Sequence, residues 1–346
     1  MHHANEIWFS LKDNVTYIDD SDISELKENQ DTLLIVMDCL INALIILFNI
    51  FLVALILCKR NLRQKLFYWR ILNLCFSDLV VGVLVLPFAI SYMHNYSWIH
   101  GDTLCRAYVI LDVTHFGFSA LVITTMCIDR LLSKILEIYP ERLKIVKYTQ
   151  ILIFVLPWFF SLCIFLPLLL SSVKRMGVDL DHVCKFNLLD HMIVPTAVVG
   201  YLIPNIILIL TTIAMLVIYK VKGNAWYRLT EEEPTGSDVT THLRSSTIAT
   251  LIVSCVTLLF CFPYLVIMFI TVTCRSHSCI PGLEVFKATI ILCTLTSLFT
   301  PCLWITDDEI RSAVKQFIHS VRTFFQARTL GVREFNYHEQ INEEDL

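Results

Sequence analysis

Seven apolar runs, each about as long as a bilayer is thick, fill most of this 346-residue chain. A helix of roughly 20 apolar residues spans the roughly 30 Å hydrocarbon core of a membrane, because each residue advances it by about 1.5 Å. Backbone N–H and C=O groups that face lipid must pair within their own segment, which a helix achieves and an irregular loop does not. The sequence therefore predicts an all-α membrane protein, with seven transmembrane helices in one bundle.

The composition supports a single membrane bundle. Hydrophobic residues make up 56% of the chain and charged residues 17%, whereas about a quarter of a soluble domain is charged. We expect the helices at 32–58, 68–92, 102–134, 148–171, 190–220, 244–272 and 284–306. The expected division is an N-terminal tail (1–31), the bundle (32–306), a membrane-surface helix (307–325) and a C-terminal tail (326–346). The longest break, from Lys220 to Arg244, is rich in Gly, Pro and Glu and predicts a mobile polar loop.

The placement of lysine and arginine predicts the orientation. Most of the 27 such residues follow the first, third, fifth and seventh apolar runs, and loops rich in these residues stay in the cytoplasm. The first of these groups is Lys59, Arg60, Arg63, Lys65 and Arg70. We therefore expect a plasma-membrane protein with an extracellular N-terminus. The first 31 residues have no basic stretch before a short apolar core, so we expect no cleaved signal peptide.

Two glycosylation sequons and four cysteines fall on the expected outer face. Asn14 and Asn95 each begin an Asn-x-Ser/Thr sequence, and Asn95 lies closer to the membrane. Disulfides persist in the extracellular environment. The outer cysteines are Cys105, Cys184, Cys274 and Cys279.

The third apolar run carries acidic residues at both ends. Asp112 and Asp129 are separated by about 25 Å of helix at 1.5 Å per residue, so one lies near the outer mouth and the other at the cytoplasmic end. Arg130 follows directly. A charge on a membrane-spanning helix is costly and usually faces a cavity or a partner. This run is therefore the first place to look for a functional site.

From about residue 32 to 325, the chain resembles the rhodopsin-like (class A) G-protein-coupled receptors, because each apolar run carries a landmark of that family. These landmarks are Asn49, Asp78, Pro87, Trp98, Gly101, Cys105, Asp129, Arg130, Trp158, Pro167, Pro204, Pro263 and Pro301. The resemblance implies a disulfide between Cys105 and Cys184. It also implies a small-molecule ligand on the outer side and a heterotrimeric G protein as the cytoplasmic partner.

Within this resemblance, Asp112 stands where aminergic receptors bind a protonated amine. A desolvated carboxylate near aromatic rings favours a cation, so we expect a biogenic-amine-like ligand. The expected pocket consists of Asp112, Phe116, Thr196, Gly200 and Tyr264.

Two alternatives stay open for this pocket. Asp112 can instead be structural, paired with Thr114, His115 or Thr294. Thr196 and Gly200 stand where catecholamine receptors present serines. A peptide or lipid ligand therefore remains the alternative.

Asp78 lies deep in the second apolar run, and no Lys or Arg is found at its level. A lone buried carboxylate must be protonated or recruit a cation. By resemblance this is a sodium site, with Ser119, Asn49 and Ser297 as co-ligands. Thr300 replaces a family Asn and weakens that site, so a protonated Asp78 within a hydrogen-bond network is the alternative.

The resemblance is weakest in the residues that change conformation. Cys261 replaces the Trp before Pro263, Leu243 replaces the acid that can pair with Arg130, and Trp304 ends a Thr-Pro-x-x-Trp segment in place of Asn-Pro-x-x-Tyr. The altered positions together are Thr212, Leu243, Cys261, Thr300 and Trp304. They indicate a changed conformational equilibrium whose direction stays open, and a silent or decoy scaffold is a second alternative.

After the seventh run, Asp307 opens a stretch with one apolar face, which predicts a helix on the inner membrane surface. The sequence has no internal repeat of the kind that transporters show. It also has no Gly-rich phosphate loop, metal-ligand cluster or Ser-His-Asp arrangement. We therefore expect neither an enzyme nor a nucleic-acid-binding protein.

Overall fold

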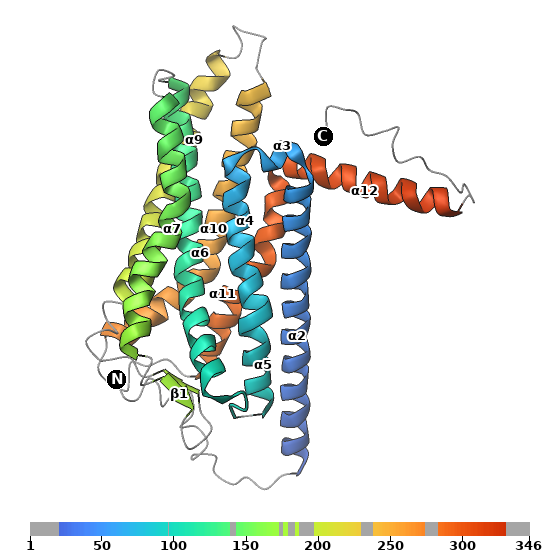
Figure 1. Cartoon of the computed structure of the whole chain (residues 1–346), viewed down its shortest axis with the longest axis vertical. Coiled ribbons are helices and arrows are strands. Elements are labelled where there is room, and N and C mark those ends of the chain that lie inside the picture. Colours follow the sequence, from blue (N-terminus) through green and yellow to red (C-terminus); the bar gives the residue numbers. More distant parts are fainter. Residues whose placement is uncertain are drawn as a thin grey trace.

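In the computed structural model, the described residues are 21–95, 97–138, 143–172, 176–178, 184–186, 197–229, 238–273 and 283–329. They form an elongated bundle of long helices (Figure 1). The helices are α2 (Ser21–Cys58), α3 (Arg60–Arg63), α4 (Leu66–Val80), α5 (Leu86–Asn95), α6 (Gly101–Ile138), α7 (Leu143–Ser172), α9 (Ile203–Leu229), α10 (Asp238–Thr273), α11 (Leu283–Leu303) and α12 (Asp308–Thr329).

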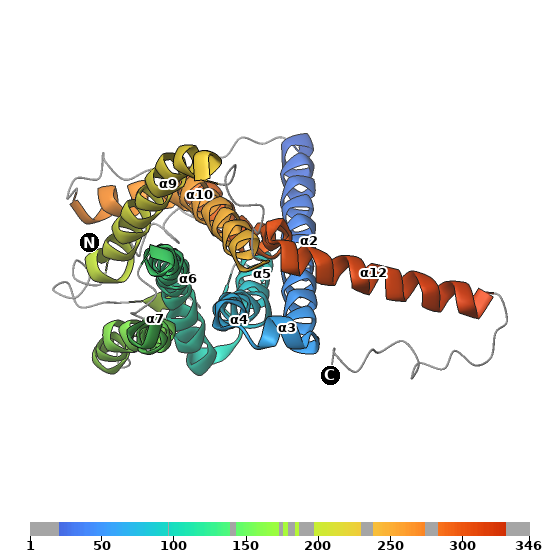
Figure 2. The ribbon, with the colours of Figure 1, turned by 90° about the horizontal axis from the view of Figure 1, so that it is seen from above.

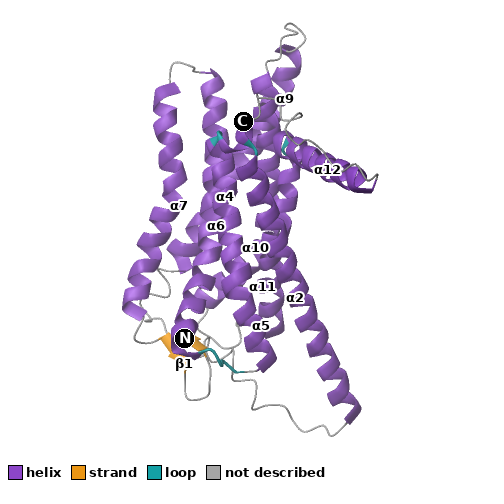
Figure 3. Ribbon diagram, turned by 45° about the vertical axis from the view of Figure 1, so that its right-hand side comes forward, coloured by secondary structure: helices purple, strands orange, loops and turns teal. Residues whose placement is uncertain are grey.

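Shorter segments complete the chain. They are the π-helical η2 (Val81–Val85) and η4 (Ala197–Leu202), the 3₁₀ turn η6 (Trp304–Thr306), and the strands β1 (Met176–Val178) and β2 (Cys184–Phe186). The two strands pair antiparallel outside the bundle, a hairpin that the apolar runs did not predict. We call the end with this hairpin the hairpin end, and the opposite end, from which α12 projects sideways, the α12 end (Figures 2 and 3).

The predicted all-α bundle is confirmed. Each predicted run contains a helix, the second being α4–η2–α5, the fifth η4–α9 and the seventh α11–η6. Among the described residues, six spans are long and apolar enough to cross a membrane, and α7 adds a shorter apolar stretch, Ile151–Cys163. Large apolar side chains such as Phe159, Leu259 and Phe262 stand exposed on the bundle, as lipid contact requires.

The predicted loop between Lys220 and Arg244 is largely wrong. Helix α9 continues to Leu229 and α10 already begins at Asp238, so only residues 230–237 of this break lie outside the described residues. The reason is physical: bilayer thickness limits the apolar length of a helix and not its total length. The break contains one strong helix breaker, Pro234, which lies in the undescribed part.

Prolines shape the second and fifth helices. Each π segment lies just before a proline, η2 before Pro87 and η4 before Pro204. Proline lacks an N–H and its ring crowds the carbonyl four residues earlier, and a local widening to π geometry relieves both problems. A Cβ at Gly82 would come within 2.9 Å of Ile46, so glycine lets η2 lie close against α2.

A disulfide and a buried tryptophan stabilise the hairpin end. The Cys105–Cys184 disulfide forms as the resemblance implied, and it joins the start of α6 to β2. Trp98 is almost fully buried and donates from Nε1 to the carbonyl of Gly101 at 2.8 Å. Gly101 has a φ of 78°, a left-handed conformation that favours glycine, and the chain turns here into α6.

Candidate functional site

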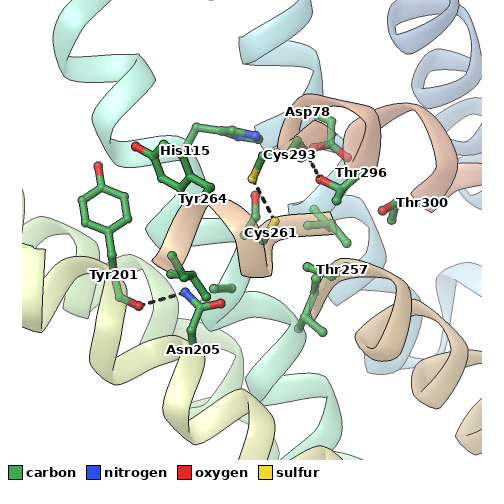
Figure 4. A pocket seen from close by; sticks show the side chains of 15 residues that line it. Asp78, His115, Tyr201, Asn205, Thr257, Cys261, Tyr264, Cys293, Thr296 and Thr300 are labelled. Carbon is green, nitrogen blue, oxygen red and sulfur yellow. Dashed lines mark hydrogen bonds between the residues drawn. The ribbon is translucent and has the colours of Figure 1, made fainter. Parts of the chain in front are cut away.

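A cavity lies in the middle of the bundle, between α4, α6, α10, α11 and the η4–α9 helix (Figure 4). Tyr201 and Tyr264 line it on one side, and Asp78 and Thr300 line it on the other. Cys261 lies between the two tyrosines and Asp78. It stands where the family has a Trp, and its smaller side chain fills less of the cavity than a Trp side chain would. One cavity therefore includes both the predicted ligand-binding Tyr264 and the predicted sodium-binding Asp78.

Asp112, on α6, lies near three tyrosines from different elements. It is close enough to interact electrostatically with Tyr108, Tyr201 and Tyr264, and the last two line the cavity. Two of its alternative partners have other hydrogen bonds: Thr114 donates to the carbonyl of Ile110 at 2.5 Å, and His115 Nδ1 lies 2.9 Å from Ser77 Oγ. Asp112 itself is not among the described residues that line the cavity, so its role as a ligand-facing carboxylate stays a prediction.

The other predicted pocket residues fall in different places. Gly200 is buried in the π segment η4. Thr196 and the side chain of Phe116 lie outside the described parts of the structure. Phe118, a further aromatic of α6, packs edge-on against Trp158 with ring centroids 4.8 Å apart, so it belongs to the core.

The predicted sodium ligands lie close together. Asn49 donates from Nδ2 to the carbonyl of Ser297 at 3.1 Å, and Ser297 lies beside Asp78. Ser119 lines the same cavity as Asp78, and its Oγ lies 3.4 Å from Ser77 Oγ. Helices α2, α4, α6 and α11 thus bring four side chains of the expected set to one place.

This cluster fits a small hard cation. Asp78 is 2% exposed, and its Oδ2 has no hydrogen-bond partner among the described residues; the same holds for Asn49 Oδ1. A buried oxygen without a donor is costly unless a cation or water binds it. Asp78 would supply the charge and Asn49, Ser119 and Ser297 neutral oxygens. Apart from such an oxygen cluster, no group of three His, Cys, Asp or Glu suited to a metal occurs in the described part of the chain.

Two cysteines from neighbouring helices line the cavity and contact one another. The thiols of Cys261 on α10 and Cys293 on α11 point toward one another, with the sulfur atoms 2.9 Å apart (Figure 4). Each helix also contains a proline, Pro263 two residues after Cys261 and Pro301 about two turns after Cys293. Cys261, which was predicted for the switch, therefore contacts α11 through the thiol of Cys293, a residue that the sequence did not single out.

At the α12 end, Asp129 binds two arginines. Arg70 Nη1 and Arg130 Nη2 lie 2.9 Å and 2.5 Å from the same carboxylate oxygen, Asp129 Oδ2. Asp129 is 0% exposed and Arg70 is 1% exposed. The sequence placed Arg70 among the loop charges that mark the cytoplasmic side, and that assignment is wrong because the residue lies inside the bundle on α4.

Arg130 also reaches two neutral partners. Its Nη1 donates to Ser246 Oγ on α10 at 2.7 Å, and its guanidinium carbon lies 4.1 Å from the centre of the Phe67 ring. Trp304 is completely buried and meets Phe67 edge-on at 5.9 Å. Thr212 on α9 is also buried. Leu243 replaces the acid that can pair with Arg130 in the family. In this structure Arg130 instead donates to a serine hydroxyl of α10.

The second helix also holds the start of α12. Tyr68 donates its hydroxyl to Asp307 Oδ1 at 3.0 Å, and the same oxygen accepts the N–H groups of Glu309 and Ile310, both at 3.1 Å. Asp307 thereby caps the helix. Burial raises the pKa of the Asp307 carboxyl, and the N–H and Tyr68 donors oppose that rise. Lys65 pairs with Glu309 just outside.

The remaining predicted modification sites are only partly described. Asn95 is exposed near the hairpin end, and its Nδ2 donates to the carbonyl of Ser91 at 2.7 Å. Asn14, Cys274 and Cys279 lie outside the described residues. Glycosylation and the second disulfide therefore stay predictions.

Sequence reasoning missed Arg70 as a functional residue. A signal for it was present: Arg70, Leu74 and Asp78 repeat every fourth residue, which places them on one face of a helix. Because Asp78 was expected to face the interior, the same face predicts that Arg70 does so too. Because Arg70 follows closely on Lys59, Arg60, Arg63 and Lys65, it was grouped with those residues instead.

The fold and these sites define a multi-pass membrane protein of the receptor class. The family described as 7 transmembrane receptor (rhodopsin family) matches residues 48–304. Because this match covers most of the chain, the protein belongs to that family, whose members are receptors rather than enzymes.

Relatives among characterised proteins are distant. The chain is 28% identical to the Dopamine D2-like receptor of Drosophila melanogaster over 167 residues, 47% of this chain and 18% of the relative. It is 29% identical to the human 5-hydroxytryptamine receptor 1F over 145 residues, 42% and 38% of the two chains. It is 32% identical to the G-protein coupled receptor homolog K2 of Swinepox virus (strain Kasza) over 171 residues, 46% and 45%. The matches span less than half the length of each of these relatives.

Proposed function

We propose that this protein is a plasma-membrane receptor that binds an extracellular cationic amine at Asp112 and passes the signal to a heterotrimeric G protein. In this proposal the hairpin end faces outward and the α12 end faces the cytoplasm. The orientation follows the basic residues at the α12 end, such as Lys59, Lys65 and Arg311. Dopamine, 5-hydroxytryptamine and octopamine receptors among the relatives support the amine class.

The observation that carries the amine proposal is the environment of Asp112. A carboxylate lies among Tyr108, Tyr201 and Tyr264 within the bundle. Such a site attracts an alkylammonium group, because the carboxylate neutralises it and ring faces stabilise it. The bundle interior has a lower effective dielectric constant than water, so the attraction is stronger than at the surface.

A panel of biogenic amines tests this proposal in cells that report G-protein activation. We expect at least one amine to activate the wild type, and Asp112→Asn to weaken its potency by about 10- to 100-fold, the factor for losing roughly 1.5–3 kcal/mol of a charged hydrogen bond. Asp112→Glu, which keeps the charge, should retain more potency than Asp112→Asn.

The matched control is Asp38→Asn, which removes a carboxylate from α2, away from the cavity residues. It should leave potency unchanged at equal surface expression. An amine that acts equally well on wild type and Asp112→Asn contradicts the amine proposal. A peptide or lipid agonist that is indifferent to Asp112 would then replace it.

We also propose that Na⁺ binds at Asp78 with Asn49, Ser119 and Ser297. The partnerless oxygens of Asp78 and Asn49 support this site. A bound cation would supply charge compensation between α2, α4, α6 and α11. It would thereby stabilise one packing of these helices.

A further inference from the structure

Arg70 is a buried charge that the family resemblance does not explain. It projects from α4 to the carboxylate that Arg130 also binds, and the two guanidinium groups share one oxygen of Asp129. We propose that Arg70 is a positioning residue for G-protein coupling: it keeps Asp129 charge-compensated when Arg130 departs, and so eases the release of Arg130. This inference rests on the proposed G-protein coupling but not on the identity of the ligand.

The first step of the argument is the burial of Asp129. This carboxylate is 0% exposed, so its arginine partners rather than water compensate its charge in this structure. A buried charge that loses its only partner is strongly destabilised. With Arg130 as the sole partner, release would carry that full cost. With Arg70 in place, one ion pair remains after Arg130 has gone.

The second step is the competition between the two arginines. Arg70 and Arg130 are close enough to repel one another electrostatically. Two cations beside one carboxylate leave an excess positive charge in a buried site, and departure of either arginine removes it. The arrangement therefore favours a state in which one guanidinium has moved away.

The third step identifies which arginine moves. The Arg70 side chain is 1% exposed and lies within α4, whereas the Arg130 side chain is 10% exposed at the α12 end. The contacts of Arg130 beyond Asp129 are a serine hydroxyl, Ser246 Oγ, and the ring of Phe67. A neutral hydroxyl holds a guanidinium less strongly than a carboxylate does. Arg130 is accordingly the arginine that leaves, and both its ion pair with Asp129 and its hydrogen bond to Ser246 on α10 must break.

The test is ligand-free G-protein activation, measured per receptor at the cell surface with a panel of Gα subunits. We expect the wild type to signal clearly above Arg130→Ala, which sets the floor. We expect Arg70→Met to signal about tenfold less than the wild type, since Asp129 then depends on Arg130 alone. Arg70→Lys restores a charge and should recover part of the signal.

A double variant separates positioning from mere structural support. Arg70→Met with Asp129→Asn removes the acid as well, so no carboxylate holds Arg130, and signalling should return to the wild-type level or above. It also leaves no buried acid without a partner, so it tests the proposal even if Arg70→Met fails to reach the surface. The matched control is Arg106→Met, which removes an arginine paired with Asp102 near the hairpin end and should change nothing.

Two results overturn the inference while leaving the receptor function intact. One is an Arg70→Met receptor that signals like the wild type at equal surface density. The other is a double variant that signals no better than Arg70→Met. If the wild type matches Arg130→Ala with every Gα subunit and every amine, coupling itself fails, and the proposed function is overturned together with this role of Arg70.

Discussion

The cavity in the middle of the bundle and the charged cluster at the α12 end each contain a buried carboxylate, but the two carboxylates differ in their partners. In the cavity, Asp78 lies 2% exposed with an oxygen that no described residue satisfies. At the α12 end, Asp129 is more deeply buried and has two cationic partners, Arg70 and Arg130. Asp78 therefore has no cationic partner among the described residues, whereas Asp129 has two, both at its Oδ2.

This difference separates a site that receives something from a site that rearranges. A carboxylate without a partner gains stability when a cation arrives from outside. A carboxylate with two partners can give up one and remain compensated. Under the proposed function, the cavity accordingly binds the cation and the α12 end changes conformation.

Removal of Asp129 should have the largest effect on stability. Asp129→Ala leaves Arg70 and Arg130 buried without their acid, and we expect a loss of about 3–5 kcal/mol. Thermal unfolding of purified receptor in detergent or nanodiscs, together with surface expression, measures this loss. Asp102→Ala, which removes a partly exposed acid paired with Arg106, is the control and should cost about 1 kcal/mol or less. Equal losses for both variants would remove the contrast between buried and exposed pairs.

Neutralising Asp78 should act in the opposite direction. Asp78→Asn replaces a buried carboxylate that has no cationic partner among the described residues by a neutral amide, so without sodium we expect a gain of about 1–3 kcal/mol. Thermal unfolding in sodium chloride and in choline chloride at equal ionic strength measures both effects. Sodium should stabilise the wild type and not the variant. A variant that still responds to sodium would place the ion elsewhere.

Loss of the Tyr68 hydroxyl should have a local effect. Tyr68→Phe removes one of the three donors to Asp307 Oδ1, at a cost of about 1.5 kcal/mol for a hydrogen bond to a charged group. Amide hydrogen exchange in the first turn of α12 should quicken by about tenfold. Tyr148→Phe, on an exposed tyrosine of α7, is the matched control. Unchanged exchange in α12 would show that the backbone donors alone fix the cap.

The smallest effect is expected at the exposed pair between Lys65 and Glu309. The Lys65 side chain is 49% exposed, and pairs of this kind contribute about 0–1 kcal/mol. Lys65→Ala should therefore shift thermal unfolding slightly, and less at high salt than at low salt. A loss as large as that of Asp129→Ala would mean that exposure does not govern the strength of charge pairs at this end.

The seven helices and the Asp78 cluster could be predicted because one landmark in each apolar run fixes which face of the helix turns inward. That register brings Asn49, Ser297 and Asp78 together without knowledge of any distance. The extents of α9 and α10 at the α12 end could not be predicted, because an apolar run marks only the part of a helix that lies in lipid. The double pairing of Asp129 depends on how closely α4 approaches α6, which local sequence does not specify.

The anchoring of α12 has a practical consequence. Its contacts reach the first two transmembrane helices and their junction: Lys59 with Gln316 at 2.8 Å, Phe51 with Phe317 at 5.4 Å, and Tyr68 with Asp307. It also contacts α10, where the N–H of Asp308 donates to Ser245 Oγ at 2.8 Å. A spin label or fluorophore on its exposed face, for example at Ser320, would therefore report distances from a helix that is anchored to α2 and α4. Displacement of α10 could be measured from there as a change in distance within a single chain.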